Sequence, residues 1–586
     1  MAILIEENVP RTLEQLMDRL RNDSLRGALV EAWLFEGAPA RRAAERHLAA
    51  RGIEARLRSA YKPLVHFFLE DVTVSKLRRA TVRYPVHELA HPRRFVIEAY
   101  PLAAMLSEIE TRFLPGDSTL SYRVELEDRH GAATAHEVPC PCRIREDHLG
   151  TRALSPAGWL RITGSRNGSL DVDQPLRTEF ETIFDQLIAT VGAYPWASHE
   201  PFFDRLVIRA DIPEAEQRLP YGEECVSTFE ALHEDVYFSL LELFERRAGR
   251  PTGDRTAQPG QIVPDVRRAE GTPRIRVTLE RADEAVPSQP SLPAEPVELE
   301  TAEKMLSPAQ ISEELAKLGG QRFSATSRQG RTVAGVYRTG ERPAVLITAG
   351  QHANEPSGIV GALRAAHRLA ARPGTHFALI PLENPDGYAL DRWLCAQHPR
   401  HMHHAARYTA LGDDLQARSR EPWYEKAARL RARQLSGAAL HVNLHGYPSH
   451  EWTRPFCGYL PRGFEPWSIP KGFFLIVRHH PRWGERAAAF LAQLTERLGD
   501  VPGLAAFNRT QLEVYRAHAG EPSFPVRHGI PCQITEDEHA LMPLVLITEF
   551  PDETIYGDLF VFAHTVQMEA VIAAEEIHAA LEPAAG

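Results

Sequence analysis

One stretch, Ala344–Gly358 (AVLITAGQHANEPSG), constrains the fold most strongly. It opens with an apolar run, 344–349, that is rich in Val, Ile and Thr, which predicts a buried strand. Gly350 ends the run, and residues 352–355 then read His-Ala-Asn-Glu. Apolar residues three and four apart follow from Ile359, so a helix is expected just past the motif. In an open α/β sheet, ligands bind where strands hand over to helices.

The spacing His-x-x-Glu is a weak signal by itself. A second copy, His518 to Glu521, has no apolar strand before it. Short motifs of this kind need a structural context before they indicate a metal site. For the first copy, that context comes from segments further along the chain.

From about residue 303 onward, apolar strands alternate with amphipathic helices. Further strands are expected at 377–381, 439–444 and 544–550, and helices at 358–371, 485–498 and 560–580. This alternation predicts an α/β domain with a mixed, mostly parallel sheet and helices on both faces.

Each expected strand ends at residues suited to one chemistry. His352 and Glu355 follow the first strand, an Asn-Pro-Asp-Gly turn (384–387) follows the second, His445 ends the third, and Glu549 lies on the fourth. Zinc in hydrolytic sites takes three protein ligands, and a His/His/Glu set is one of the known combinations. A nearby carboxylate must accept the proton of the attacking water.

Four segments, GQHANEPSG, LENPDGY, LHVNLHGY and VLITEF, in this order, resemble the zinc carboxypeptidases of the carboxypeptidase A superfamily. The resemblance covers about residues 300–580. It implies one Zn²⁺ per chain, held by His352, Glu355 and His445, and a zinc-bound water activated by Glu549 as general base. It also implies a peptide substrate and an eight-stranded mixed sheet with helices on both sides.

The sequence departs from this family where an Asn-Arg pair usually binds the substrate's terminal carboxylate and polarises the scissile carbonyl. The corresponding stretch, 412–418, reads Gly-Asp-Asp-Leu-Gln-Ala-Arg. Gln416 stands for the Asn, and Arg418 stands for the Arg one place late. Arg392 is the candidate for the family's second arginine, and Tyr515 for its mobile tyrosine. The alternative is that both arginines are solvated surface residues.

Three functions remain open at this point. The first is a zinc metallocarboxypeptidase that releases a C-terminal residue from a peptide. The second is a zinc-dependent deacylase or amidohydrolase that acts on N-acylated amino acids or related small amides, which the displaced arginine keeps open. The third is a non-catalytic binding module, which the intact candidate base Glu549 disfavours.

A chain of 586 residues predicts two or three domains. We expect an α+β accessory region of unknown role at 1–249, a Pro/Gly-rich linker or bridge at 250–300, and the catalytic domain at 301–586. In the N-terminal region the pattern predicts strands at 81–86, 94–99, 120–126 and 158–163 and a helix at 227–247. That helix opens with a capping-box signature, Ser227 to Glu230.

Composition limits the partners and the compartment. The chain is 43% hydrophobic and 25% charged, as soluble globular proteins are, and its net charge of −11 argues against nucleic acid and anionic membranes. It contains no apolar run long enough to span a membrane, and its first residues lack the pattern of a signal peptide. The six cysteines are scattered, so a cytoplasmic protein with reduced thiols is expected. The oligomeric state is left open.

Three other motifs have ordinary explanations. The sequence His87-Glu-Leu-Ala-His91 matches a zinc-peptidase helix, but prolines bracket it and we expect a surface turn. Cys140 and Cys142 lack a second pair at zinc spacing and are expected to be structural. The histidines at 398, 401, 403 and 404 suggest either an extra metal site or, preferably, an exposed loop near the active site.

Overall fold

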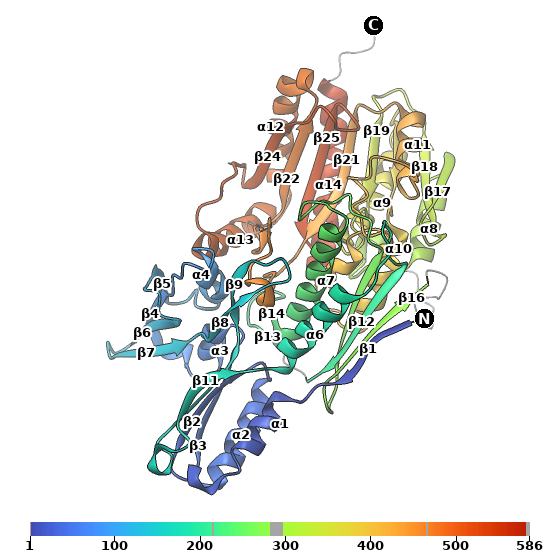
Figure 1. The fold of residues 1–586 in the computed structure, drawn as a ribbon. Helices are drawn as coiled ribbons and strands as arrows, with labels where there is room; N and C mark the ends of the chain where they lie inside the picture. Colours follow the sequence, from blue (N-terminus) through green and yellow to red (C-terminus); the bar gives the residue numbers. More distant parts are fainter. Residues whose placement is uncertain (1, 214–215, 282–296, 465–466, 582–586) are drawn as a thin grey trace.

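The computed structural model describes residues 2–213, 216–281, 297–464 and 467–581, and a large sheet dominates the C-terminal part (Figure 1). Its nine strands lie in the order β17 (Gln321–Thr326), β18 (Thr332–Arg338), β20 (Phe377–Ile380), β19 (Val345–Ala349), β21 (Leu440–Tyr447), β25 (Leu544–Pro551), β22 (Phe474–His479), β24 (Ile530–Glu536) and β23 (Val526–Arg527). The strands expected around residues 344, 377, 439 and 544 are therefore neighbours in the sheet.

This sheet is mixed, as predicted, but half of it is antiparallel. Among the described strands, four of the eight pairings are parallel and four are antiparallel, so the expectation of a mostly parallel sheet is corrected. The sheet also has one strand more than the resemblance implied, because the two-residue β23 pairs at the edge. The central strands β20, β19, β21 and β25 are all parallel, so their carboxyl ends meet at one edge.

Helices cover both faces of the sheet. Alternate residues of β19 point to opposite faces. Val345 and Ile347 pack in a cluster with α9 (Ser357–Ala370), α12 (Gly484–Gly499) and α14 (Asp558–Leu581). Leu346 packs in a second cluster with α11 (Lys426–Ser436). Because both faces are buried, these strands read as continuous apolar runs rather than as alternating ones.

The N-terminal region is α+β and contains three four-stranded sheets (Figure 1). The first is β1 (Ala2–Asn8), β16 (Arg274–Glu280), β12 (Arg205–Ile212) and β15 (Gln261–Arg268); the second is β11 (Val172–Leu176), β10 (Gly158–Thr163), β2 (Leu29–Leu34) and β3 (Glu54–Ser59); the third is β5 (Glu110–Pro115), β4 (Leu77–Tyr84), β6 (Ser121–Asp128) and β7 (Ala133–Pro139). Two short hairpins add β8 (Cys142–Glu146) with β9 (Arg152–Pro156), and β13 (Glu216–Arg218) with β14 (Cys225–Ser227).

Helices accompany these sheets, the longest being α7 (Thr228–Arg247). The others in the region are α1 (Thr12–Arg19), α2 (Ala38–Ala50), α3 (Pro63–Glu70), α4 (Arg94–Glu98), α5 (Leu102–Met105) and α6 (Glu179–Ala193). Helix α7 begins at the expected place, since the side chain of Ser227 accepts a hydrogen bond from the backbone of Glu230. The side chain of Glu230 binds His450 instead of completing the predicted capping box.

The segment expected as a linker contains two strands of the N-terminal sheet. Residues 282–296 of that segment lie outside the described residues, but β15 and β16 lie within it and both pair with β12. Pro264 lies within β15, which is the edge strand of its sheet, a position where proline is tolerated because one side of the strand has no partner. The part of the segment before residue 282 is therefore built into the N-terminal region.

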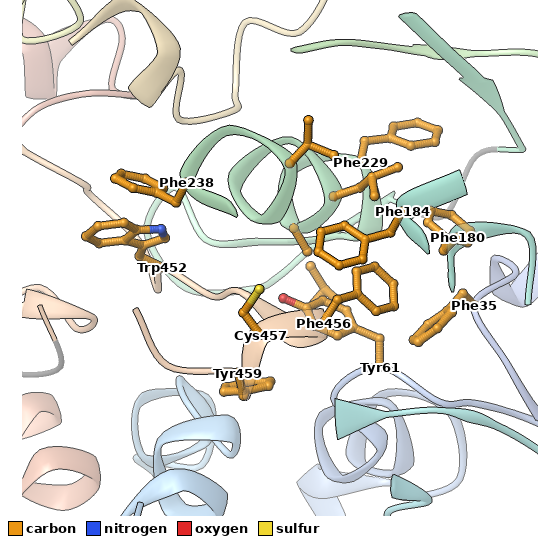
Figure 2. Close-up of a cluster of buried hydrophobic side chains, with 14 of the residues drawn as sticks. Phe35, Tyr61, Phe180, Phe184, Phe229, Phe238, Trp452, Phe456, Cys457 and Tyr459 are labelled. Atoms are coloured by element: carbon orange, nitrogen blue, oxygen red, sulfur yellow. The ribbon is translucent and has the colours of Figure 1, made fainter. Parts of the chain in front are cut away.

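Helix α7 joins the two parts of the chain through a shared hydrophobic cluster (Figure 2). Phe229 and Phe238 of α7 lie in it with Trp452 and Phe456 of the C-terminal part. The ring of Phe456 stacks on Phe184 of α6, with centroids 5.3 Å apart. The C-terminal part thus packs directly on the N-terminal region.

Two local predictions were wrong. The segment expected as a strand at 94–99 forms helix α4, whose Arg94 donates to the carbonyl of Leu154, so tertiary contacts override its strand-like composition. The sequence at 384–387 is the start of helix α10 (Pro385–Cys395) rather than a free turn, with Asn384 as its N-cap. No helix in the described parts of the chain is long and apolar enough to cross a membrane.

Candidate metal centre and active site

His352, Glu355 and His445 meet at the carboxyl edge of the central strands. The first two lie in the loop between β19 and α9, and His445 lies on β21. Nδ1 of His352 is 2.9 Å from Oε1 of Glu355, and Nδ1 of His445 is 2.9 Å from Oε2 of Glu355 and 3.0 Å from Nδ1 of His352. All three side chains are buried. The residues predicted as ligands therefore form one cluster with the donor atoms that zinc prefers.

The backbone at this edge is held closely by its surroundings. Gly350, which ends β19, has a φ of +61°, and a Cβ there would lie 2.9 Å from Cδ1 of Leu382. Gln567 of α14 donates a hydrogen bond of 2.8 Å to the backbone carbonyl of His445, which lies on the neighbouring strand β21. These contacts hold in place the loop that carries His352 and the strand that carries His445.

A carboxylate behind His352 orients its ring. Oδ2 of Asp414 lies 3.5 Å from Nε2 of His352, and Oδ1 accepts a hydrogen bond of 3.0 Å from Gln351. Burial acts to raise the pKa of Asp414, but the hydrogen bond and the charge of His352 hold it well below its usual range. Carboxylates in this position fix the orientation of metal-binding imidazoles and raise their basicity.

Glu355 receives a further donor, since Nη1 of Arg407 lies 2.8 Å from its Oε1. Burial acts to raise the pKa of Glu355, but the charges of His352, Arg407 and His445 lower it well below the usual value. Burial lowers the pKa of His445. Glu355 is therefore held as a carboxylate, the form in which it can bind a metal ion.

Glu549 lines the same cavity as two of the three donors, His352 and His445. Its backbone pairs with that of His445 across β21 and β25, and both side chains line a cavity of about 380 Å³. Burial, and next the charge of Glu355, raise the pKa of Glu549 well above its usual value. A carboxyl group of raised basicity that lines the same cavity as candidate metal ligands is suited to accept and donate protons.

Gln416 is the one predicted substrate-binding residue that lines this cavity. Its Oε1 accepts a hydrogen bond of 2.5 Å from Arg429 of α11. Its neighbour Ala417 also lines the cavity, at the position where the resembled family carries its arginine.

Arg418 does not have the role expected for it. Its side chain is buried, and all five guanidinium N–H groups are used. The acceptors are both oxygens of Asp413, Glu425, the carbonyl of Trp423 and Thr409. These bonds stabilise the loop fold and leave no donor for a ligand.

Arg392 and Tyr515 also lie away from the cavity. Arg392 donates to the backbone carbonyl of Leu306 at 3.1 Å, on the outer side of α10. Tyr515 lies on α13 (Leu504–Ala519) and packs in the hydrophobic cluster at the N-terminal region, with its ring 6.3 Å from that of Phe524. The predicted substrate-binding roles of these two residues are therefore not supported.

Three contributors to the site were missed at the sequence level. Arg407 and Asp414 lie in the Arg- and His-rich segment 392–436, whose elements the sequence pattern did not reveal. Asp414 precedes Gln416 by two residues, and that proximity was the only local signal. Phe238 of α7 lines the cavity although it belongs to the N-terminal region, which no pattern in the sequence indicated.

The other histidine motifs are also placed. His87 and His91 lie in turns, where each Nδ1 accepts a hydrogen bond from the backbone two residues on, as expected. His518 packs against the N-terminal region, with its Nδ1 2.8 Å from the carbonyl of Val96. The expectation of an exposed loop around residue 400 was wrong, because His401, His403 and His404 are buried.

His404 is covered by α7, which explains the burial of this segment. Its Nδ1 lies 2.6 Å from Oε2 of Glu234, and its ring stacks on Trp452 with centroids 4.4 Å apart. His404 and Trp452 both line the cavity. The N-terminal region therefore forms one wall of the site.

No protein-family model and no curated protein matches this sequence. Solved structures to which it is similar include a metallo-carboxypeptidase from Pseudomonas aeruginosa in complex with (2-guanidinoethylmercapto)succinic acid, at 15% identity and a TM-score of 0.29, which covers 54% of this chain and 74% of that one. A metallo-carboxypeptidase from Burkholderia cenocepacia has 15% identity and a TM-score of 0.30, with 53% and 74% covered. Carboxypeptidase A from Helicoverpa armigera has 12% identity and a TM-score of 0.31, with 53% and 90% covered.

Proposed function

We propose that this chain is a zinc-dependent hydrolase that cleaves a peptide bond and releases a C-terminal residue. One observation carries the proposal: the carboxylate of Glu355 contacts the imidazoles of His352 and His445, and both imidazoles line a cavity that Glu549 also lines. Hydrolytic metal sites combine three protein donors with a carboxylate that moves protons.

The donor set fits zinc in type and environment. Two imidazole nitrogens and one carboxylate face one another within 3.0 Å and are buried, which is costly for polar groups that share no cation. Asp414 stands behind His352, as carboxylates do at metal-binding imidazoles. When bound, zinc would act as a Lewis acid that polarises the substrate carbonyl and lowers the pKa of water.

Glu549 is the proposed proton carrier. Its carboxylate accepts a proton from water in the cavity as that water attacks the carbonyl carbon, and it then donates the proton to the leaving amine. The guanidinium of Arg407 is the proposed stabiliser of the negative charge that develops on the carbonyl oxygen, because it lines the cavity next to Glu355.

The terminal carboxylate of a peptide needs a cation other than Arg418. Three arginines line the cavity, Arg255, Arg407 and Arg478. Arg407 is engaged by Glu355, and Arg255 is 3.6 Å from Asp414. Arg478 is 3.8 Å from Asp537 and partly exposed. Arg255 and Arg478 are the proposed carboxylate-binding candidates.

A second function, hydrolysis of N-acylated amino acids or related small amides, is favoured by one observation. Ala417 lines the cavity and Arg418 has no free donor, so the carboxylate-binding arrangement of a carboxypeptidase is incomplete at that position. Small amides without a carboxylate next to the scissile nitrogen need no such site, whereas N-acylated amino acids carry their carboxylate at the same place as the C-terminal residue of a peptide.

A substrate panel with zinc-loaded protein tests both functions. Peptides with a free C-terminus should be cleaved faster than their C-terminally amidated forms and than N-acyl amino acids, and a chelator should abolish cleavage. Arg255→Met and Arg478→Met identify the carboxylate partner, since only loss of that partner should erase the preference for the free C-terminus. Faster turnover of N-acyl amino acids would favour the second function, and hydrolysis that survives chelation would exclude both.

A further inference from the structure

A second cluster of metal-type donors lies where the N-terminal region meets the segment after α10. It consists of Glu216 on β13 and of His398 and His401, and one ligand atom from each lies within 4.8 Å of the others. Glu216 is exposed, His398 is half-buried and His401 is buried. The proposed active site uses none of these residues.

The imidazoles of this cluster are set up as metal ligands. Nε2 of His398 donates to the backbone carbonyl of Val266 at 2.7 Å, so its Nδ1 carries the lone pair. Metal-binding histidines commonly donate their other ring nitrogen to a backbone carbonyl in this way. The rings of His398 and His401 stack with centroids 4.4 Å apart and 2° between their planes.

An acidic group completes the donor set. Nε2 of His401 lies 2.6 Å from Oε2 of Glu216 and 3.1 Å from the hydroxyl of Ser227. The imidazoles of His398 and His401 repel each other if both are protonated, because Glu216 is hydrogen-bonded to His401 alone. A divalent cation between the three groups would interact favourably with all of them.

We propose that Glu216, His398 and His401 bind a second divalent transition-metal ion, with zinc the ion that suits two imidazoles and a carboxylate. Three protein donors leave room for at least one solvent ligand, and the exposure of Glu216 and the partial exposure of His398 give that ligand access. The chemistry of the donors excludes the oxygen-seeking cations Ca²⁺ and Mg²⁺ as preferred occupants.

This site would hold the wall of the proposed active site in place. Glu216 belongs to the N-terminal region, whereas His401 belongs to the C-terminal part. His404, three residues after His401, contacts Glu234 and lines the cavity. Three residues further, Arg407 reaches Glu355. An ion that joins Glu216 to His401 would therefore fasten the segment that carries Arg407. Its role is structural, because the reacting groups lie elsewhere.

Metal content and zinc titration of the full chain test the proposal. Wild type should carry two zinc ions per chain after gel filtration, and the Glu216→Gln/His398→Gln variant should carry one. Neither side chain is buried, and Gln keeps the capacity to form hydrogen bonds, so the fold should be retained. Circular dichroism should confirm this. His539→Gln, at a side chain that is 89% exposed, is the matched control and should retain two.

A second background separates this site from the proposed catalytic one. The His352→Ala/His445→Ala variant should still bind one equivalent of zinc in calorimetric titration, and zinc should raise its Tm. Adding Glu216→Gln and His398→Gln should abolish both effects. The proposal is wrong if the His352→Ala/His445→Ala variant binds no zinc, or if its binding is unchanged by the added substitutions. Failure of peptide hydrolysis would affect neither result.

Discussion

Nη1 of Arg407 lies 2.8 Å from Oε1 of Glu355, so an arginine that lines the cavity is bonded to a proposed metal ligand. The charge of Glu355 raises the pKa of Arg407 against the opposing effect of burial, which keeps the guanidinium charged at any pH of interest. A fixed positive charge at this place is positioned for a developing oxyanion.

Replacing Arg407 by Met should therefore reduce kcat by about 10²–10³, the usual effect of losing one stabilising donor. Zinc content should be unchanged, because Glu355 keeps its carboxylate. Steady-state kinetics with metal analysis on the same preparation checks this. Arg255→Met, at a cavity arginine that contacts Asp414 rather than Glu355, is the control and should alter KM more than kcat. Unchanged kcat in Arg407→Met would exclude the role.

Glu549→Gln should keep its zinc and its fold but lose about 10²–10⁴ in kcat, because the amide cannot accept the proton of the attacking water. The same measurements apply, with zinc loading determined beforehand. Glu536→Gln, at an exposed position on β24, should behave as wild type. Turnover near the wild-type rate in Glu549→Gln would remove this residue from the proposed mechanism.

Asp414→Asn should weaken zinc binding by about 10- to 100-fold, as expected when a carboxylate behind a metal-binding imidazole is lost. Competition with a chromogenic chelator measures the change. The adjacent Asp413 is a close control: it binds Arg418 through both oxygens, so Asp413→Asn should destabilise the fold and leave the zinc affinity of the folded protein unchanged. Equal loss of affinity in both variants would contradict the assignment.

His450 gives a prediction for pH. Its Nε2 lies 2.7 and 2.9 Å from the two carboxylate oxygens of Glu230, and both side chains are buried. Burial acts to lower the pKa of His450, but the charge and hydrogen bond of Glu230 raise it to about 9. Because the folded pKa exceeds the unfolded value, this pair stabilises the fold fully below about pH 6.5, and the contribution is lost as pH rises through 9.

The difference in Tm between wild type and His450→Gln should therefore be largest near pH 6 and shrink toward pH 9.5. The linked contribution is about 3 kcal/mol at the acidic end of that window. Scanning calorimetry of both proteins across the range measures it. A difference that stays constant with pH would show that His450 does not titrate with Glu230 in the folded protein.

The candidate metal-binding residues and their strands were predictable from sequence because the information is local. Each central strand is buried on both faces and reads as an apolar run, and parallel strands bring their carboxyl ends to one edge. That rule brings His352, Glu355 and His445 to the same edge, and their expected role as zinc ligands came from the resemblance to the zinc carboxypeptidases. The register of β21 and β25 then brings Glu549 opposite His445.

The remaining features depend on partners that are distant in sequence or on side-chain direction. His404 is buried because Glu234, 170 positions earlier, covers it, and no pattern near His404 reveals this. Arg418 was assigned by its place in a motif, but a motif does not show where a guanidinium points. Here Asp413 and Glu425 bind it within the loop. The contribution of α7 to the cavity wall could not be predicted either, because the residues that it contacts are distant in sequence.

The dependence of the cavity wall on α7 has a consequence for the order of synthesis. Helix α7 leaves the ribosome well before its partners, since Glu230, Glu234 and Glu242 pair with residues 170 to 220 positions later. At ordinary elongation rates that gap lasts roughly 10–40 s. During this time the carboxylates of Glu230 and Glu234 lack these partners and are solvated by water, whereas Glu242 can already pair with His148. The packing of the C-terminal part against α7 can therefore be completed only once nearly the whole chain has been made.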